Sequence, residues 1–319
     1  MATIKDLAKM SEVSVTTVSR VLNNHPYVSA DKREAVLRAI KATDYHQNIN
    51  AVNLIKGKTK TVGVVVPFLD HPHFSNILDG VTKEAVIHGF KLLLFLTDYQ
   101  KDREREALNM LKEKQMDALI IVSKACELSE IKAHQKYGKI IIGEEVDDKE
   151  ISSAYVDQNG AFVEALEFLY DHGHRLIGYS VSRNTSENSL RRKQHYIEFL
   201  KERGLPFREE YIIDKTMYIE DSQRIFNKLN SMQKKPTGMV ITSDQVAAGV
   251  MINSSKNNIR IPEDLAIVGS GNDPIAKLME LTTVEVPLIE IGKSLFKQAL
   301  QEEISQIQFK ANLIVRKTV

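Results

Sequence analysis

The chain has 319 residues, of which 43% are hydrophobic and 27% are charged, an ordinary balance for a soluble protein of two or three domains. No segment is long and apolar enough to cross a membrane, and the first residues lack the apolar core of a signal peptide, so we expect a cytoplasmic protein without a membrane partner. The single cysteine, Cys126, excludes an internal disulfide.

Positive charge is concentrated at the N-terminus. Residues 1–58 contain nine Lys and Arg side chains against five Asp and Glu, a net charge of +4, whereas the whole chain carries +1 and residues 59–319 therefore carry −3. Because nucleic acids attract clustered cations, this asymmetry favours phosphate contact by the N-terminal part alone.

Two short helices are predicted first, one at residues 4–10 and one within the stretch 14–23. Thr3 and Asp6 form a weak capping box for the first helix, and Ser14 can cap the second. Ile4, Leu7 and Ala8 supply the inner face of the first helix, and Val18, Val21 and Leu22 form one apolar stripe on the second. The three-residue turn between the helices is typical of a helix-turn-helix.

A third helix is predicted from Ser29, and its inner face is expected to use Ala35 or Val36, Leu37 and Ile40. A plain helical bundle with exposed Thr and Arg fits this spacing about as well as a DNA-reading head does. The basic charge of the segment favours the DNA-reading interpretation.

Residues 48–58 form a connector whose Asn and β-branched residues are mediocre helix formers, so a helix here would need a partner. A flexible linker would explain Gly57 and the lysines. It would not explain the apolar pair Leu54 and Ile55 in an exposed connector.

From Thr61 onward, short apolar runs alternate with amphipathic stretches, as in parallel strands covered on both faces. The first series has predicted strands at 62–66, 92–96, 118–122 and 140–142, and predicted helices at 75–88, 103–114 and 127–136. The second series has predicted helices at 160–172, 190–203, 221–231 and 245–257, and predicted strands at 176–179, 239–241 and 266–268. A helix at 288–304 and a strand at 309–316 are expected to cross back between the two halves.

Motifs over the full length resemble one family. The head contains Thr3-Ile4-Lys5-Asp6-Leu7-Ala8, Val13-Ser14, Val18-Ser19-Arg20-Val21-Leu22-Asn23 and Tyr27-Val28-Ser29, and the body contains TVGVVVP at 61–67 and IPEDLAIVG at 261–269. These motifs resemble the lactose-repressor/galactose-repressor family of bacterial transcription regulators. The resemblance implies an N-terminal all-α helix-turn-helix head and an α/β periplasmic-binding-protein-like body of two doubly wound parallel-sheet subdomains.

The same resemblance implies domain boundaries. The DNA-binding head would span residues 1–58, with a hinge helix at about 48–57, and the effector-binding and dimerisation body would span 59–319. Its N-subdomain would comprise about 60–158 and 288–306, and its C-subdomain about 159–286 and 308–319.

By resemblance, the chain is a dimeric repressor that binds an inverted-repeat operator in double-stranded DNA, at the nucleoid. Val15 is expected against a thymine methyl and Arg20 on a guanine edge. In the family the hinge helix inserts a leucine into the minor groove, which makes Leu54 the candidate wedge. The DNA-binding residues implied are Thr3, Ser14, Val15, Thr16, Thr17, Ser19, Arg20, Asn23, Tyr27, Asn48, Ala51 and Leu54. Glu12 stands where the family usually has Gly, and Gln47 and Val52 replace a frequent Pro and Arg.

Ligands of open parallel sheets lie beyond the carboxyl ends of the strands, and two such sheets would present these ends to a shared cleft. Carboxylates, Arg and an aromatic platform are the groups that recognise sugars. The candidate effector-binding residues are Phe68, Asp70, Phe74, Asp98, Ser123, Glu144, Arg192, Asp244 and Asn272, with His71 and Asp157 at comparable positions.

Arg192 matches the Arg that holds the effector in the family, but His195 replaces the usual Gly, Ser243 a frequent Asn, and Gly271 an acidic residue. The charge balance of the cleft therefore moves toward positive. This balance favours a phosphosugar, or a longer oligosaccharide held mainly by Phe68 and Phe74.

An enzyme is the competing class. No Gly-x-Gly-x-x-Gly follows the first strand, and the sequence has no Walker loop, Cys/His metal cluster or nucleophile elbow, so neither a cofactor nor a metal is expected. His71, His73, His172 and His174 are expected to be helix caps or solvated loop residues. A regulator controlled by a protein co-regulator, and a sugar-binding protein without DNA activity, remain open.

Overall fold

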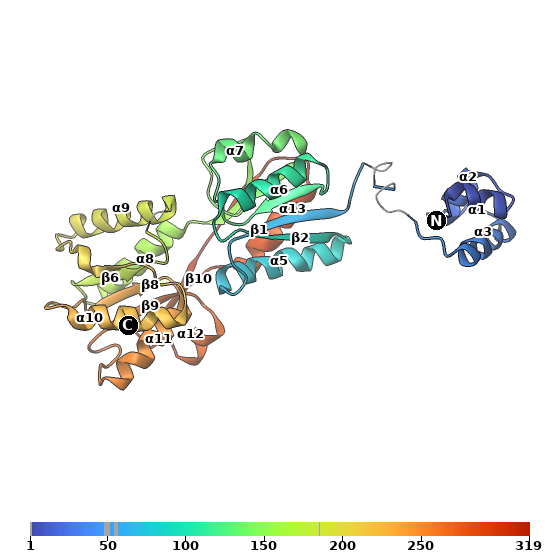
Figure 1. Cartoon of the computed structure of the whole chain (residues 1–319). Coiled ribbons are helices and arrows are strands. Elements are labelled where there is room, and N and C mark those ends of the chain that lie inside the picture. Colours follow the sequence, from blue (N-terminus) through green and yellow to red (C-terminus); the bar gives the residue numbers. More distant parts are fainter. Residues whose placement is uncertain (1, 48–51, 54–56, 185) are drawn as a thin grey trace. The chain divides into compact units, whose positions relative to one another are not determined.

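A computed structural model describes residues 2–47, 52–53, 57–184 and 186–319, and it separates into two compact units, residues 1–59 and 60–319 (Figure 1). The predicted hinge residues Asn48, Ala51 and Leu54 lie outside the described residues. Their roles therefore stay predictions.

The N-terminal unit contains the three predicted helices, α1 (Ile4–Met10), α2 (Val15–Leu22) and α3 (Ala30–Thr43). The capping box of α1 is confirmed, because the Thr3 backbone N–H donates to Asp6 and the Asp6 N–H donates to the Thr3 hydroxyl. The core of the unit consists of Leu7, Ala8, Val18, Val21, Val36 and Ala39.

The inner face of α3 differs from the prediction at one position. Val36 and Ala39 are buried, but Leu37 is 52% exposed and lies off the core. Ser29 precedes α3 as its N-cap without a side-chain hydrogen bond. The two buried positions are three residues apart, the spacing of one helix face, and Leu37 lies outside it.

The second unit contains two six-stranded sheets. The first, here the N-sheet, has the strand order β11-β5-β4-β3-β1-β2, and all of its strand pairs are parallel. Its strands are β1 (Thr61–Val66), β2 (Lys91–Leu96), β3 (Ala118–Ile121), β4 (Lys139–Ile142), β5 (Ser152–Val156) and β11 (Gln306–Phe309). Its helices are α5 (Pro72–His88), α6 (Lys101–Lys112), α7 (Leu128–Lys132), the short η1 (Gln135–Tyr137) and α13 (Leu288–Leu300).

The second sheet, here the C-sheet, has the order β12-β10-β9-β8-β6-β7, and β12 is its antiparallel member. Its strands are β6 (Ile177–Ser180), β7 (Ile212–Ile213), β8 (Gly238–Ile241), β9 (Ala266–Gly271), β10 (Thr283–Glu285) and β12 (Asn312–Ile314). Its helices are α8 (Gln158–Asp171), α9 (Glu187–Glu202), α10 (Ser222–Ser231), α11 (Asp244–Lys256) and α12 (Pro274–Leu278), with the short η2 (Glu209–Tyr211) and η3 (Ile219–Asp221).

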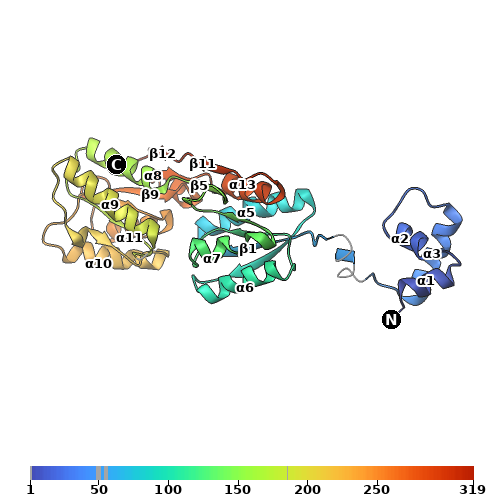
Figure 2. The same ribbon diagram turned by 90° about the horizontal axis from the view of Figure 1, so that it is seen from above.

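Both sheets are covered on two faces, which confirms the doubly wound fold. In the N-sheet, α5 and α13 pack on the face of Val62 and Val64, while α6 and α7 pack on the face of Val65 (Figure 2). In the C-sheet, α8 and α9 cover one face, and α10 and α11 cover the other (Figure 1). Strands buried on both faces explain why the sequence shows continuous apolar runs.

The end of the chain departs from the prediction. Instead of one strand at 309–316, the chain forms β11 in the N-sheet and β12 in the C-sheet, with Lys310 and Ala311 between them. The preceding helix stops at Leu300, short of the predicted residue 304. A segment that passes from one sheet to another must break its pairing, so two short strands replace one long strand.

Candidate functional site

Helix α2 exposes both polar and apolar side chains on the surface of the head. Val15, Thr16 and Arg20 are exposed, whereas Val18 and Val21 on the same helix are buried. Arg20 has no ion pair among the residues described. This helix therefore offers solvent one β-branched side chain, one hydroxyl and one free guanidinium within six residues.

The ends of α2 are held by local hydrogen bonds. Ser14 accepts a hydrogen bond from the Thr17 N–H at 3.1 Å and shares a second one between the two hydroxyls. At the other end, the Asn23 amide donates to the Ser19 carbonyl at 2.8 Å. Of the other predicted DNA-binding residues in the head, Thr3 is exposed and Tyr27 is 84% exposed beside the His25 ring.

The turn between α1 and α2 contains a backbone conformation that glycine prefers. Glu12 has a φ of +51°, in the left-handed region. The carboxylate is exposed, so the acidic residue at this position adds both backbone strain and a negative charge to the turn.

In the second unit, residues that follow strands of the N-sheet form one connected group. Phe68 lies between Phe74, at 6.2 Å between ring centroids, and Tyr99, at 5.6 Å. The Tyr99 hydroxyl lies 3.3 Å from the Ser123 hydroxyl, which donates a hydrogen bond to Glu144. The structure thus brings together four of the predicted effector residues.

Residues of the C-sheet side contact this group directly. The Arg183 guanidinium carbon, in the segment after β6, lies 3.3 Å from the Tyr99 ring centroid. The Tyr218 hydroxyl donates to Asp70 at 3.4 Å. Burial, Asp70 and the nearby Asp98 raise the pKa of Tyr218. We call the set the inter-sheet cluster, and its members are Phe68, Asp70, His73, Phe74, Asp98, Tyr99, Ser123, Glu144, Arg183, Arg192 and Tyr218.

Arg192 on α9 is a cation of this cluster that has no carboxylate partner among the described residues. Within the described part of the chain, its side-chain hydrogen bond is a long one, 3.5 Å, to the Gln158 side chain, and its Nε is buried without a hydrogen-bond partner. The guanidinium lies 5.5 Å from the Phe162 ring, and burial lowers its pKa. A buried guanidinium without a carboxylate partner is costly unless a ligand supplies the missing acceptor.

His73 lies near the Arg192 guanidinium but carries no charge itself. Burial, followed by the nearby His71 and Arg192, lowers the pKa of His73 to about 4, so its imidazole is neutral at pH 7. His71 caps α5 by accepting a hydrogen bond from the His73 N–H at 3.2 Å. The cap predicted for this His pair is confirmed at His71, but His73 is half-buried within α5 and is not a solvated loop residue.

Glu144 is the half-buried carboxylate of the cluster, and partial burial raises its pKa. The Lys124 ammonium lies 3.8 Å from one of its oxygens, and Ser123 donates to the other. Glu144 thus already has one cation and one hydroxyl donor as partners.

Two predicted effector residues have other roles. Asp244 is fully buried at the start of α11, where it accepts hydrogen bonds from the Asp273 N–H at 2.9 Å and the Thr283 hydroxyl at 2.6 Å. Asn272 donates to Glu285 at 2.7 Å and accepts from Arg316 at 2.6 Å. Both side chains are used to order the segment after β9, so their positions argue against direct contact with a ligand.

The sequence predicts that Gly271 lacks an acidic side chain of the family, but the carboxyl group of Asp273 lies close to this position. A Cβ on Gly271 would lie 3.4 Å from the carboxyl group of Asp273. Burial and the nearby Asp244 raise the pKa of Asp273 to about 6. The count of acids from the sequence did not include this carboxyl group, because it lies two positions further along the chain.

The sequence reasoning missed Tyr99, Arg183, Tyr218 and His73. Tyr99 directly follows Asp98, so the rule that placed Asp98 at a strand end also covered its neighbour. Arg183 and Tyr218 come from irregular segments, and no periodicity marks them. A systematic reading of every residue after each strand would have found Tyr99 and Arg183, which lie within three residues of β2 and β6.

Among the residues described, no three His, Cys, Asp or Glu side chains are grouped so that they would hold a metal ion. Within the same residues, no helix has the length and apolar character needed to cross a membrane.

Comparison with known proteins adds the family. Residues 3–48 match the model of the bacterial regulatory proteins of the lacI family, and residues 59–317 match the model of the periplasmic binding proteins and sugar binding domain of the LacI family. The HTH-type transcriptional regulator YkvZ of Bacillus subtilis is 37% identical and covers 100% of both chains. The NTD biosynthesis operon regulator NtdR of the same species is 37% identical over 98% of this chain and 95% of its own.

The fold matches solved structures as well. The lac repressor dimer bound to operator and the anti-inducer ONPF is 21% identical, has a TM-score of 0.82, and covers 99% of this chain and 98% of its own. This likeness supports the fold, and the matched family models and relatives settle the membership. The chain belongs to the LacI family of bacterial transcription regulators.

Proposed function

We propose that this protein is a repressor that binds an inverted-repeat DNA operator as a homodimer, and that a small sugar-like or phosphosugar effector sets its affinity for DNA. Such a regulator would work in the cytoplasm, at the nucleoid. The observation that carries the proposal is the α2 surface, where Val15, Thr16 and Arg20 are exposed on a helix whose other side is buried. A thymine methyl and a guanine edge are the partners that Val15 and Arg20 suit.

The charge distribution supports the assignment of DNA to the head. The net charge of +4 in residues 1–58, against −3 in the rest, would attract phosphates to the head and repel them from the body. One small head makes few contacts with DNA bases and binds a specific sequence weakly. A dimer that places two heads on two half-sites doubles these contacts.

An apolar surface on the body supports the homodimer. β2 is an edge strand of the N-sheet with Leu94 and Leu96 exposed, and the adjacent α5 exposes Val86 and Ile87, each at 73%. On the C-sheet side, Leu278 of α12 is 80% exposed. An edge strand flanked by exposed apolar side chains is a surface that a monomer does not leave open, and a second copy of the chain would cover it.

Arg192 supports an anionic effector. Its buried Nε lacks an acceptor, the nearby His73 is neutral, and no carboxylate among the described residues pairs with Arg192. A phosphate or a pair of sugar hydroxyls would provide the fork of acceptors that a guanidinium takes. Phe68 and Phe74 would supply the apolar platform.

A carbohydrate and phosphosugar panel tests the proposal. Calorimetry on the full chain should find an anionic sugar ligand that Arg192→Ala binds at least about tenfold more weakly, since one charge-assisted hydrogen bond is worth about 1.5–3 kcal/mol. Lys193→Ala is the matched control and should bind normally, because Lys193 is a cation of the same helix α9 that pairs with Glu209 of η2. A neutral monosaccharide preferred over its phosphate, or equal binding by the Arg192 variant, would reject this effector class.

The two alternatives give different results in the same experiments. If a protein co-regulator controls the chain, no small molecule in the panel will bind or alter operator affinity. If the chain binds sugar without a DNA function, binding-site selection with the full chain will return no consensus.

A further inference from the structure

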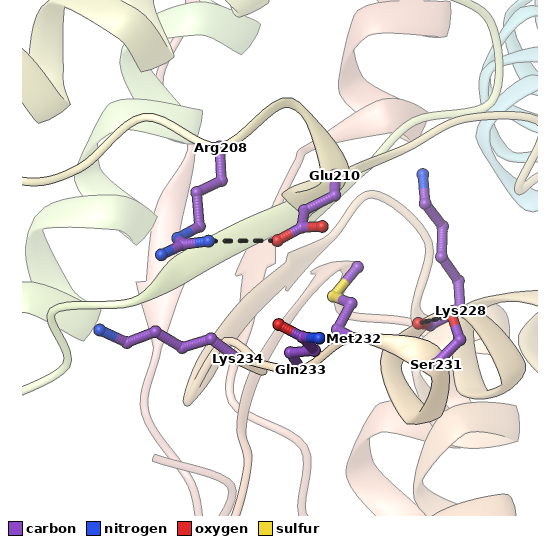
Figure 3. Close-up of a pocket in the computed structure, with 7 residues that line it drawn as sticks. All are labelled: Arg208, Glu210, Lys228, Ser231, Met232, Gln233 and Lys234. Atoms are coloured by element: carbon purple, nitrogen blue, oxygen red, sulfur yellow. Dashed lines mark hydrogen bonds and ion pairs between the residues drawn. The ribbon is translucent and has the colours of Figure 1, made fainter.

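A hollow of about 770 Å³ lies on the C-sheet side of the body (Figure 3). Its volume is within the usual range for small-molecule sites. The lining residues are Arg208, Glu210, Lys228, Ser231, Met232, Gln233 and Lys234. Three of these side chains are cations and one is an anion.

The cations of the hollow are only partly neutralised. Arg208 reaches Glu210 through a single contact of 3.4 Å, and its Nε is buried without a hydrogen-bond partner. The Lys228 ammonium donates to the Ile212 carbonyl at 3.1 Å, and no ion pair to Lys228 or Lys234 occurs among the described residues. The hollow thus retains a net positive charge and unused donors.

The framework around these cations is fixed. The Tyr211 hydroxyl donates to the Lys234 carbonyl at 2.8 Å, which joins η2 to the segment after α10, and Arg208 lies over the Tyr211 ring at 5.9 Å. The end of α10 at Ser231 contributes about half a negative charge from its carbonyls, which is less than the surplus of the three cations.

The hollow is distinct from the inter-sheet cluster. Arg208 and Glu210 precede β7, and Lys228 to Lys234 precede β8, so these residues gather at the amino ends of the two parallel strands that lie on either side of β6. The cluster uses the residues that follow strands. A ligand in the hollow would therefore lie at the opposite end of the C-sheet strands from the proposed effector.

We propose that this hollow is a second binding site for a small phosphate-bearing anion, held by Arg208, Lys228 and Lys234. The Lys228 and Lys234 side chains extend to opposite sides of the hollow (Figure 3), so they would turn inward on binding. Their ammonium groups and the Arg208 guanidinium would then match the oxygens of a phosphate group, which accepts several charge-assisted hydrogen bonds at once. The site does not depend on the effector or DNA assignment, because it shares no residue with either.

Lysine footprinting on the full chain tests the site with inorganic phosphate and pyrophosphate as probes. Bound phosphate should slow the acetylation of Lys228 and Lys234, as measured by mass spectrometry. Lys201 is the internal control, because it is exposed in the last turn of α9 and does not line the hollow, and its rate should not change. Chloride at the same ionic strength should protect none of the three.

Binding calorimetry distinguishes the hollow from the proposed effector site. The double variant Arg208→Gln/Lys234→Gln should bind pyrophosphate about tenfold more weakly, as expected for the loss of charge-assisted hydrogen bonds. The control Lys112→Gln/Lys201→Gln, with the same change in net charge, and Arg192→Ala should both bind it as the wild type does. Equal weakening by the control pair, loss of binding in Arg192→Ala, or unchanged acetylation of Lys228 would each overturn the proposal.

Discussion

The Arg183 guanidinium stacks on the Tyr99 ring, with 3.3 Å between the guanidinium carbon and the ring centroid. Arg183 follows β6 of the C-sheet and Tyr99 follows β2 of the N-sheet, so this contact links the two halves of the body. A desolvated cation–π contact is worth about 2 kcal/mol, enough to shift an equilibrium between open and closed halves about 30-fold.

Arg183→Ala should therefore open the body in the absence of ligand. We expect a larger radius of gyration by small-angle X-ray scattering. Arg175→Ala is the matched control, because it removes a comparable stack on Tyr170 inside the C-sheet half, at 3.9 Å. Equal scattering curves for wild type and Arg183→Ala would show that the contact does not hold the halves together.

The pKa of Asp273 predicts a dependence of stability on pH. The native pKa of about 6 is above the ordinary value of 3.8, so ionisation disfavours the native state. The native state is therefore most stable, as far as Asp273 is concerned, below pH 3.8. It loses this stability as the pH rises through 6 and Asp273 ionises. At pH 7 the penalty would be about 3 kcal/mol at most.

Asp273→Asn should remove this penalty. The variant is expected to be more stable than the wild type at pH 7, with a difference that shrinks toward pH 4. Urea unfolding of both proteins across this range measures it. A constant difference at every pH would exclude the titration of Asp273 as its cause.

Glu12 holds a left-handed backbone conformation in the turn before α2. Glu12→Gly should stabilise the head by about 1 kcal/mol, the relief of strain less the added entropy of the unfolded chain. Loss of the carboxylate should also tighten DNA binding. Calorimetric unfolding and gel shifts on the full chain measure the two effects.

Asn24→Gly is the control for that change, since Asn24 has a φ of +53° and asparagine tolerates this region. Its effect on stability should be small. If both substitutions stabilise the head equally, relief of strain specific to Glu12 is not the reason.

The fold followed from the sequence where the local pattern was strong. Capping residues before α1 and α2, and apolar runs such as 62–66, correspond to observed elements because local hydrogen bonds and burial on both faces act within a few residues. β10 and the division of 309–316 into two strands depend on which sheet lies nearby. Such pairing is set by contacts far along the chain, which a local pattern does not contain.

The site was predicted less completely for the same reason. Phe68, Phe74, Ser123 and Glu144 meet because parallel strands end at one edge, a rule that operates on sequence alone. Asp244 satisfied that rule too, yet Thr283 and the Asp273 backbone occupy its carboxylate. Whether a polar side chain faces a ligand or its own fold depends on these long-range partners.

A substitution at Leu54, which lies outside the described residues, tests the predicted hinge helix. Leu54→Ala should weaken specific binding and reduce the bend at the centre of the operator, because a wedge between base pairs kinks the duplex. A gel-shift phasing assay measures the bend. The half-site preference should stay the same, and an unchanged bend angle would indicate a plain linker instead.

Base reading by α2 is the central claim, and selection of binding sites from random DNA by the full chain and by Arg20→Ala tests it most directly. The wild type should return an inverted repeat. The variant should return the same repeat with the preference flattened at one base pair in each half-site, the loss of a contact worth about 1–3 kcal/mol. An identical consensus from both proteins would contradict the assignment of α2 as the reading helix.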